Sequence, residues 1–262
     1  MECQIMELRN KVALIIGGSS GLGEATARLF ASEGATCAIV ASKNVRKANK
    51  IARDIKRKSK GYVCDVTKSG QVTKLVEKVL KDHKKIDILV NSAGIFVPTP
   101  AGCSKNSDIN LMIDVNLKGT LNTINAVVPH MKSRKRGNII NMASVAGVRA
   151  LPLYGVYCAT KAGIVMLTKV MATELSRDGI HVNSISPGNT ETPMNETIRT
   201  DPEWKPILDF MQKVTPSGRT YSTADEIANT ALFLASPKTG NPIFGANFVI
   251  DEGFGAGLFI AE

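Results

Sequence analysis

The sequence has no hydrophobic run long enough to cross a membrane, because none of its apolar stretches approaches the roughly 20 residues that a spanning helix needs. Its first residues, MECQIMELRNKVALIIGG, have no basic flank, long apolar run or small-residue cleavage site, so they do not resemble a secretory signal. The five cysteines are scattered and form no CxxC pair. We therefore expect free thiols, a cytoplasmic location and no membrane partner.

Metal-binding and hydrolase motifs are also missing. The three histidines, His83, His130 and His181, are far apart in the chain and show no ligand spacing, so we predict no metal site. The sequence contains no G-x-S-x-G elbow and no Ser, His and Asp in a hydrolase order. Neither metal-dependent nor serine-hydrolase chemistry is indicated.

Aromatic residues are scarce where basic residues are dense. The formal net charge is +10, and much of the excess lies in KNVRKANKIARDIKRKSK, residues 43–60. Without aromatic side chains this run offers no stacking platform for bases. A nucleic-acid patch remains one interpretation, but a helix with a solvated basic face is favoured, and we predict no nucleic-acid partner.

Short apolar runs alternate with helix-patterned segments along the chain. The first pair is KVALIIG followed by GEATARLFASEG, and the pattern continues to NFVIDEG near the end. Strict alternation of this kind predicts right-handed crossovers and a parallel sheet covered on both faces. The predicted fold is α/β, a single Rossmann-type doubly wound parallel β-sheet with helices on both faces. One domain would span residues 1–262, with residues 1–10 as an N-terminal extension.

One segment, residues 189–223, breaks the alternation. It carries four prolines and the only tryptophan, Trp204, without a steady hydrophobic period. Inserts of this length in compact domains are commonly functional. We favour a substrate lid, since Trp204, Ile207, Phe210 and Met211 need apolar surface to cover, over a poorly ordered surface excursion.

A glycine-rich turn follows the first predicted strand and opens the first helix. Gly17, Gly21 and Gly23 in IIGGSSGLGEA have the spacing GxxxGxG. Glycines permit a tight turn and let backbone N–H groups and a helix N-terminus approach a pyrophosphate. Ser19 and Ser20 add hydroxyl donors. The context of strand, turn and helix favours a dinucleotide site over a plain βα connection.

The second predicted strand lacks the acidic residue that would bind an adenosine ribose. It ends at Ala41, followed by Ser42 and Lys43. Because no carboxylate would repel a 2′-phosphate and Lys43 supplies a cation, we predict NADP(H) in preference to NAD(H). Lys43 could instead simply begin the basic helix. Asp65, after the third strand, could reach an adenine or cap the next helix.

Six motifs together resemble the short-chain dehydrogenase/reductase family. They are GxxxGxG at 17–23, NSAG at 91–94, Asn116 in VNLKG, Ser144 in NMASVAG, YxxxK at 157–161 and PG at 187–188. Their order is the one typical of the family, and the resemblance extends from Lys11 to about Gly253. Ile16, Ser92 and Glu252 depart from the usual residues, but none of the three replaces a catalytic group.

The resemblance implies a catalytic set of Asn116, Ser144, Tyr157 and Lys161. Asn116 would kink the backbone and hold a water for proton relay, and Ser144 would hold the substrate oxygen. Tyr157 and Lys161 lie one helical turn apart. A free Tyr has a pKa near 10. An ammonium about 4 Å away could supply the roughly 4 kcal/mol that lowers this value to about 7.

The same motifs indicate the residues that bind the nicotinamide dinucleotide. The small residues of NSAG would let it lie against backbone, and the segment after PG resembles the one that positions the nicotinamide ring. The set consists of Gly17, Ser19, Ser20, Gly21, Leu22, Gly23, Ser42, Lys43, Asp65, Val66, Asn91, Ala93, Gly94, Tyr157, Lys161, Pro187, Gly188, Thr190 and Thr192.

The predicted function is an NAD(P)-dependent oxidoreductase that moves hydride between nicotinamide and a ketone/secondary alcohol pair, such as a carbonyl or 3-oxoacyl-type reductase. A non-catalytic NADP(H)-binding regulatory protein is the alternative. The tract FVPTP, residues 96–100, and the lid predict a pocket for a lipophilic small-molecule substrate. Arg149 could bind a carboxylate or phosphate there, although a salt-bridged surface arginine is favoured. The resemblance also implies a homotetramer.

Overall fold

A parallel β-sheet forms the centre of the protein. The computed structural model describes residues 6–259, so Cys3 and half of the predicted N-terminal extension lie outside the described residues. In the described part the sheet has seven strands in the order β3-β2-β1-β4-β5-β6-β7, and every neighbouring pair is parallel. The strands are β1 Val12–Ile16, β2 Thr36–Ala41, β3 Lys60–Val63, β4 Ile88–Asn91, β5 Gly137–Met142, β6 Ile180–Pro187 and β7 Asn247–Ile250.

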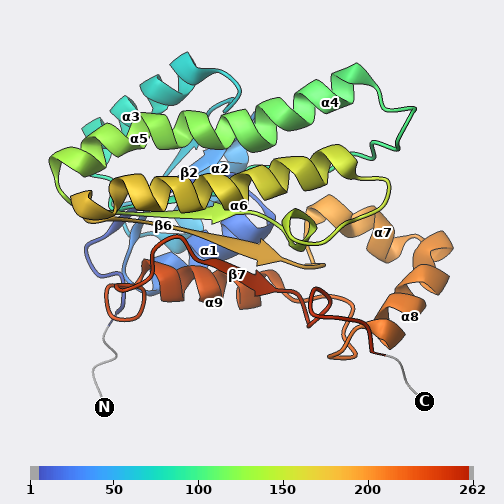
Figure 1. Ribbon diagram of the computed structural model, residues 1–262. Coiled ribbons are helices and arrows are strands. Elements are labelled where there is room, and N and C mark those ends of the chain that lie inside the picture. Colours follow the sequence, from blue (N-terminus) through green and yellow to red (C-terminus); the bar gives the residue numbers. More distant parts are fainter. Residues whose placement is uncertain (1–5, 260–262) are drawn as a thin grey trace, which may run out of the picture.

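Helices cover both faces of this sheet (Figure 1). Alternate residues of β1 enter different cores: Ala13 and Ile15 pack with Phe30 on one side, and Leu14 packs with Val127 on the other. Because both faces are covered, all five residues of β1 are buried, which explains its unbroken apolar run. The predicted doubly wound α/β fold is confirmed. The covering helices are α1 Gly21–Ser32, α2 Val45–Ile55 and α9 Ala224–Ala235 on one face, and α3 Ser69–His83, α5 Gly119–Ser133 and α6 Gly155–Leu175 on the other.

The strand order places a crevice at one edge of the sheet. β1 lies between β2 and β4, so successive crossovers leave it in opposite directions. In open α/β sheets ligands bind at the carboxyl ends of the strands beside such a reversal. The segments that follow β1, β4, β5 and β6 all emerge at this edge, and they carry most of the residues singled out in the sequence.

The long helix predicted before β5 is interrupted. α4 Asn106–Met112 leads into a π-helical turn, Ile113–Lys118, before α5 begins. Such turns widen the backbone and occur frequently at functional sites. Asn116 lies in this turn with its side chain fully buried, and asparagine is a weak helix former.

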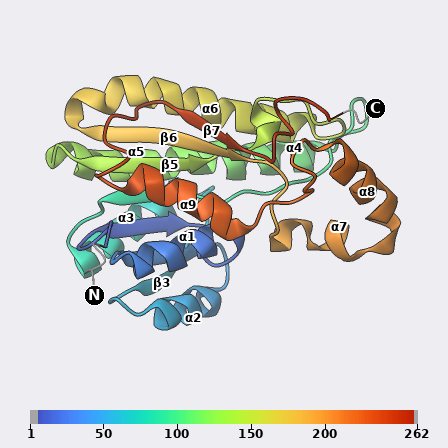
Figure 2. The same cartoon turned by 90° about the horizontal axis from the view of Figure 1, so that it is seen from below.

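Short helices make up the segment predicted as a lid. It contains 3-10 turns at Pro193–Asn195 and Pro202–Trp204, together with α7 Glu196–Thr200 and α8 Lys205–Val214. Figures 1 and 2 show α7 and α8 projecting from the body at one end of the sheet. Proline near the start of three of these elements fixes the backbone for helix initiation.

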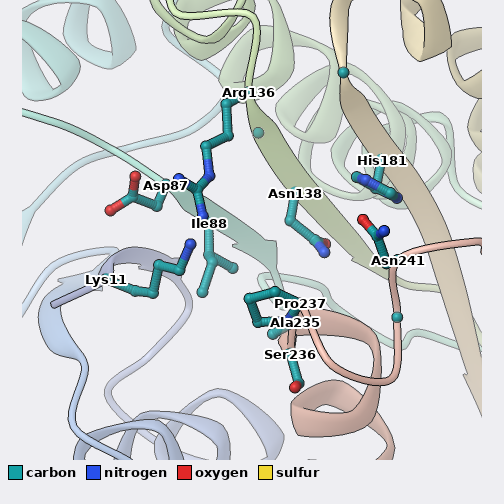
Figure 3. Close-up of a pocket in the computed structure, with 13 residues that line it drawn as sticks. Lys11, Asp87, Ile88, Arg136, Asn138, His181, Ala235, Ser236, Pro237 and Asn241 are labelled. Carbon is teal, nitrogen blue, oxygen red and sulfur yellow. The ribbon is translucent and has the colours of Figure 1, made fainter. Parts of the chain in front are cut away.

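A cavity of about 330 Å³ lies at the opposite edge of the sheet, by the amino ends of β4, β5 and β6. Figure 3 shows Lys11, Asp87 and Arg136 among the side chains that line it. Asp87 is buried and accepts hydrogen bonds from Val12 N at 2.9 Å and from Arg134 at 2.8 Å. These bonds join β1 to the end of α5, so we assign this cluster to holding the sheet edge.

The basic segment of the sequence forms α2. Its buried side chains are Ala48, Ile51 and Ala52, while the lysines and arginines between them are exposed. The geometry is that of an amphipathic helix with a solvated basic face. The absence of a nucleic-acid partner stays a prediction.

Candidate active site

The glycine-rich turn is packed so closely that side chains are excluded. Gly17 has φ +74°, and a Cβ there would lie 2.7 Å from the backbone N of Ala93. A Cβ on Gly23 would lie 2.4 Å from the carbonyl oxygen of Gly17. Ser20, which precedes α1, makes no side-chain capping bond within the described chain. The backbone N–H groups at the start of α1 therefore remain available to an anion.

Thr192 closes this turn from the side of the lid. A Cβ on Gly21 would lie 3.4 Å from the Cβ of Thr192, so the glycine-rich turn and the segment after β6 are neighbours. Thr190 is buried, and its hydroxyl donates to the carbonyl oxygen of Gly188. The residues predicted to hold the pyrophosphate and those predicted to hold the nicotinamide thus lie side by side.

The adenosine end is open and carries no acid at the end of β2. Ala41 is buried, whereas Ser42 and Lys43 are exposed. Asp65 accepts hydrogen bonds from the backbone N–H of Thr67 at 3.0 Å and from its hydroxyl at 2.8 Å. These bonds lower the pKa of Asp65, with smaller contributions from Lys68 and Lys43. Lys43 is therefore close enough to act on this end of the crevice.

Asn91 and Val66 have packing roles in the structure. The Asn91 side chain donates to Asn141 at 2.9 Å and accepts from Thr123 at 2.6 Å. These bonds and an exposure of only 4% direct the Asn91 side chain into the protein interior. Val66 packs against α5, where a Cβ on Gly119 would lie 2.6 Å from Val66 Cγ2. Ligand contacts of these two side chains have no support in the packing.

The four predicted catalytic residues are brought together at the carboxyl ends of β4 and β5. Ser144 follows β5, and Tyr157 lies in the first turn of α6. Both line one cavity of about 290 Å³, together with Leu22, Pro187, Gly188, Thr190 and Thr192. The Ser144 hydroxyl is also near enough to lower the pKa of Tyr157, although burial outweighs this effect. A substrate oxygen in this cavity can therefore meet both hydroxyl groups.

Lys161 lies behind Tyr157 and is only 5% exposed. Its Nζ donates to the carbonyl oxygen of Met142 at 2.8 Å and lies 5.6 Å from the centroid of the Tyr157 ring. A Cβ on Gly94 would lie 3.6 Å from this Nζ. Gly94 thus lies next to the ammonium, just after the end of β4.

Asn116 holds the backbone of Ile95, the residue after Gly94. Its Oδ1 accepts from Ile95 N at 2.8 Å, and its Nδ2 donates to Ile95 O at 3.0 Å and to Thr160 Oγ1 at 3.3 Å. Both backbone groups of Ile95 are satisfied by one side chain. The structure therefore gives Asn116 a positioning role, and participation in proton relay stays a prediction.

The protein's own residues raise the pKa of Tyr157. Burial raises the pKa of Tyr157 to about 12, against a smaller lowering by the Ser144 hydrogen bond. Burial also lowers the pKa of Lys161 to about 8. Desolvation of a phenolate in this apolar pocket is the largest influence on its pKa. At neutral pH the phenol is protonated, and Lys161 is largely charged.

Tyr154, Tyr221 and Phe254 also line the cavity and were not predicted from the sequence. Phe96, which was predicted, contacts the Tyr157 ring edge-on at 4.8 Å and stacks on Tyr154 at 4.1 Å. Tyr221 and Phe254 reach the cavity from late in the chain. No spacing in the sequence connects those two positions to Tyr157, because only the crossovers bring them together.

The predicted lid residues divide into two groups. Trp204, Ile207 and Met211 line the cavity, as the lid hypothesis requires. Phe210 is 62% exposed and does not line it. Phe210 therefore points away from the cavity, because adjacent residues on a helix face different directions.

These features fit a nicotinamide dinucleotide. The cradle at Gly17 and Gly23 accepts backbone only, which leaves room for a pyrophosphate at α1. Tyr157 lines the cavity and Lys161 is buried behind it, so these two residues would hold the nicotinamide half of a bound dinucleotide. The described residues contain no group of three His, Cys, Asp or Glu side chains suited to a metal ion, and no helix among them is long and apolar enough to cross a membrane.

Burial of the Lys161 charge has a measurable cost. Lowering the pKa of Lys161 from 10.5 to about 8 corresponds to about 3 kcal/mol of lost folding free energy. Because the folded pKa is depressed, this cost is full below about pH 8 and disappears as the pH rises past 10.5. We predict that Lys161→Met raises the free energy of unfolding at pH 7, and that its advantage shrinks by pH 10.

Urea denaturation at the two pH values measures this difference. Lys169→Met, on the exposed side of the same helix, is the matched control and should change stability by less than about 0.5 kcal/mol. A Lys161→Met protein that is less stable than the parent at pH 7 would contradict this account of the buried ammonium.

Comparison with known proteins agrees with this geometry. The family model for enoyl-(acyl carrier protein) reductase matches residues 17–255. A 3-oxoacyl-(acyl-carrier-protein) reductase from Thermotoga maritima is 39% identical over 89% of this chain and 94% of its own length. D-threitol dehydrogenase from Mycolicibacterium smegmatis is 37% identical over 94% of both chains.

Solved structures show the same fold. A gluconate 5-dehydrogenase from Burkholderia cenocepacia, in complex with NADP and tartrate, is 34% identical, with a TM-score of 0.89 over 96% of this chain and 98% of its own. The resemblance seen in the motifs is thereby confirmed. The chain belongs to the short-chain dehydrogenase/reductase family and is an NAD(P)-dependent oxidoreductase.

Proposed function

We propose that this protein reduces a ketone to a secondary alcohol with NADPH. The observation that carries the proposal is the meeting of Ser144 and Tyr157 in one largely apolar cavity, with Lys161 buried behind them. When bound, the cofactor supplies hydride to the carbonyl carbon. The charge that develops on the carbonyl oxygen then requires a proton, and this is the task of the protein's own residues.

Tyr157 is the proton donor in this proposal. Its raised pKa keeps the phenol protonated at neutral pH, so it can donate to the oxygen as that atom becomes basic. Ser144 orients the oxygen by hydrogen bonding, and the charge of Lys161 favours the phenolate left after transfer. Asn116 acts through Ile95, by fixing the strand end beside Lys161.

The experiment that tests this proposal measures NADPH oxidation at 340 nm with a panel of ketones. Tyr157→Phe should lower kcat by at least about 100-fold, since a positioned acid contributes that much or more. Tyr62→Phe is the control, because the Tyr62 hydroxyl bonds to Asp82 at 2.8 Å outside the cavity. A Tyr157→Phe protein with near-parental turnover would overturn the assignment.

Preference for NADPH over NADH is part of the proposal. The absence of an acid after β2, the exposure of Ser42 and Lys43, and the influence of Lys43 on Asp65 support it. The related gluconate 5-dehydrogenase was solved with NADP. A cation beside a 2′-phosphate would stabilise NADP(H) selectively, because NAD(H) lacks that group.

Lys43→Ala should raise the KM for NADPH by about tenfold, which is about 1.4 kcal/mol, and leave the KM for NADH unchanged. Lys50→Ala removes another exposed positive charge, from α2 beside the buried Ile51. It is the control for a general loss of positive charge. Equal use of both cofactors by the parent protein would contradict the phosphate interaction.

The cavity lining supports a lipophilic substrate. Trp204, Ile207 and Met211 come from the proposed lid, residues 189–223, and face Val145 and Leu151 from the body. Carbonyl reductases of the 3-oxoacyl type are among the relatives, so a keto-acyl compound is a reasonable first substrate. A purely regulatory NADP(H)-binding protein is the second candidate, and the assembled Ser144, Tyr157 and Lys161 argue against it, since sensing alone needs no proton donor.

We also propose a single catalytic domain that forms a homotetramer in the cytoplasm. Leu111 on α4 and Met166 and Val170 on α6 are 49%, 59% and 46% exposed, and the two helices contact each other. Apolar side chains exposed together on neighbouring helices favour burial against another subunit. Light scattering should give about four times the 28.0 kDa of one chain, and Met166→Lys should shift the protein to smaller species. A monomeric parent protein would refute the tetramer.

A further inference from the structure

Arg149 lines the active-site cavity with part of its charge unsatisfied. Its backbone N–H donates to the carbonyl oxygen of Val145 at 2.8 Å. This bond ties Arg149 to the residue that follows Ser144. Its guanidinium carbon lies 4.1 Å from the centroid of the Phe254 ring. Nη1 is buried and has no hydrogen-bond partner among residues 6–259. The sequence favoured a salt-bridged surface arginine, and the structure differs.

The acidic residues on the loop that carries Phe254 form bonds with other groups. The loop that carries Phe254 also contains Asp251 and Glu252. Asp251 accepts from the backbone N–H groups of Gly253 and Gly255. Glu252 accepts from Ser222 at 2.8 Å and lies 3.5 Å from Arg219. Within the described chain, Arg149 takes part in no ion pair.

A partly buried guanidinium beside an apolar cavity calls for an anion. Leaving a buried donor of a charged group unpaired costs free energy, and an anionic partner regains it. The guanidinium carbon lies over the Phe254 ring, and the two parallel N–H donors of a guanidinium match the two oxygens of a planar anion. The remaining lining is mostly apolar, with Leu151, Trp204 and Met211 among its members, so the group that pairs with Arg149 must arrive with the substrate.

We propose that the substrate is a ketone or secondary alcohol that carries a carboxylate, and that Arg149 binds this carboxylate while Tyr157 and Ser144 hold the reacting oxygen. This inference rests on the proposed function and narrows its substrate class. A carboxylate matches the single charge and planar edge of one guanidinium, whereas a phosphate dianion would leave uncompensated charge against apolar walls. The carboxylate is unchanged by the reaction, and its carbon chain spans the distance between the two groups.

The fluorescence of Trp204 allows a test that does not depend on turnover. Trp204 is the only tryptophan of the chain and lines the cavity, so ligand binding should change its emission. Protein saturated with NADP⁺ is titrated at constant ionic strength with 5-oxohexanoate, 7-oxooctanoate and 9-oxodecanoate, and with the ethyl ester of each. Oxidised cofactor cannot reduce these ketones, so only binding is measured.

The parent protein should bind at least one acid about tenfold more tightly than its ester, a difference of about 1.4 kcal/mol. Arg149→Gln should abolish this preference and leave ester binding unchanged, which also shows that the cavity is intact. Arg149→Lys should keep part of the preference. Arg177→Gln is the matched control, because Arg177 is exposed beyond the far end of α6 and its loss should not affect the preference.

Equal binding of acid and ester by the parent protein, binding of neither across the series, or an acid preference retained in Arg149→Gln would overturn the inference. Tighter binding of the matching ω-1 keto phosphonate than of the acid would also overturn it. Turnover with NADPH is scored separately. Preferred binding of an acid that is never reduced refutes the proposed function alone, and reduction of acid and ester without preference refutes the carboxylate site alone.

Discussion

Burial of the Lys161 ammonium is the constraint around which the active site is arranged. One hydrogen bond, to the carbonyl oxygen of Met142, holds the charge in place. The surroundings are made of small residues: a Cβ on Gly94 would lie 3.6 Å from Nζ, and one on Gly147 would lie 2.8 Å from the Lys161 carbonyl carbon. A side chain at Gly147 would push α6 away from the segment that follows β5, and this would change the distance between Tyr157 and Ser144.

The same burial explains why the two titrating groups are shifted in opposite directions. Both prefer their neutral forms in an apolar environment, so the pKa of Tyr157 rises and that of Lys161 falls. A protonated phenol suits reduction, in which the tyrosine must give up a proton. With a pKa of about 8, the Lys161 ammonium is still mostly charged at pH 7 and can stabilise negative charge that develops on Tyr157. The site is thus less stable than an apolar one, a common feature of sites shaped for chemistry.

Buried polar side chains set the positions of the strand ends. Asn91, Asn141 and Thr168 form a chain of hydrogen bonds from β4 through β5 to α6. Asn116 ties the π-helical turn to Ile95. Such bonds are directional, so they specify where the backbone leaves the sheet more closely than apolar contacts can. The loops that carry Gly94 and Ser144 therefore begin from fixed points.

The order of strands and helices, the glycine-rich turn and the pairing of Tyr157 with Lys161 followed from the sequence, because apolar periodicity and a four-residue helical step are local properties. The π-helical turn at Asn116, the inward-facing amide of Asn91 and the outward-facing Phe210 did not follow, because each depends on packing against residues distant in the chain. The extent to which burial raises the pKa of Tyr157 did not follow from the sequence either, since desolvation depends on how completely the fold encloses a group. The place of Arg149 beside Phe254, 105 positions later in the printed sequence, was decided only by the tertiary structure, because the last strand crossover brings those two segments to the same edge of the sheet.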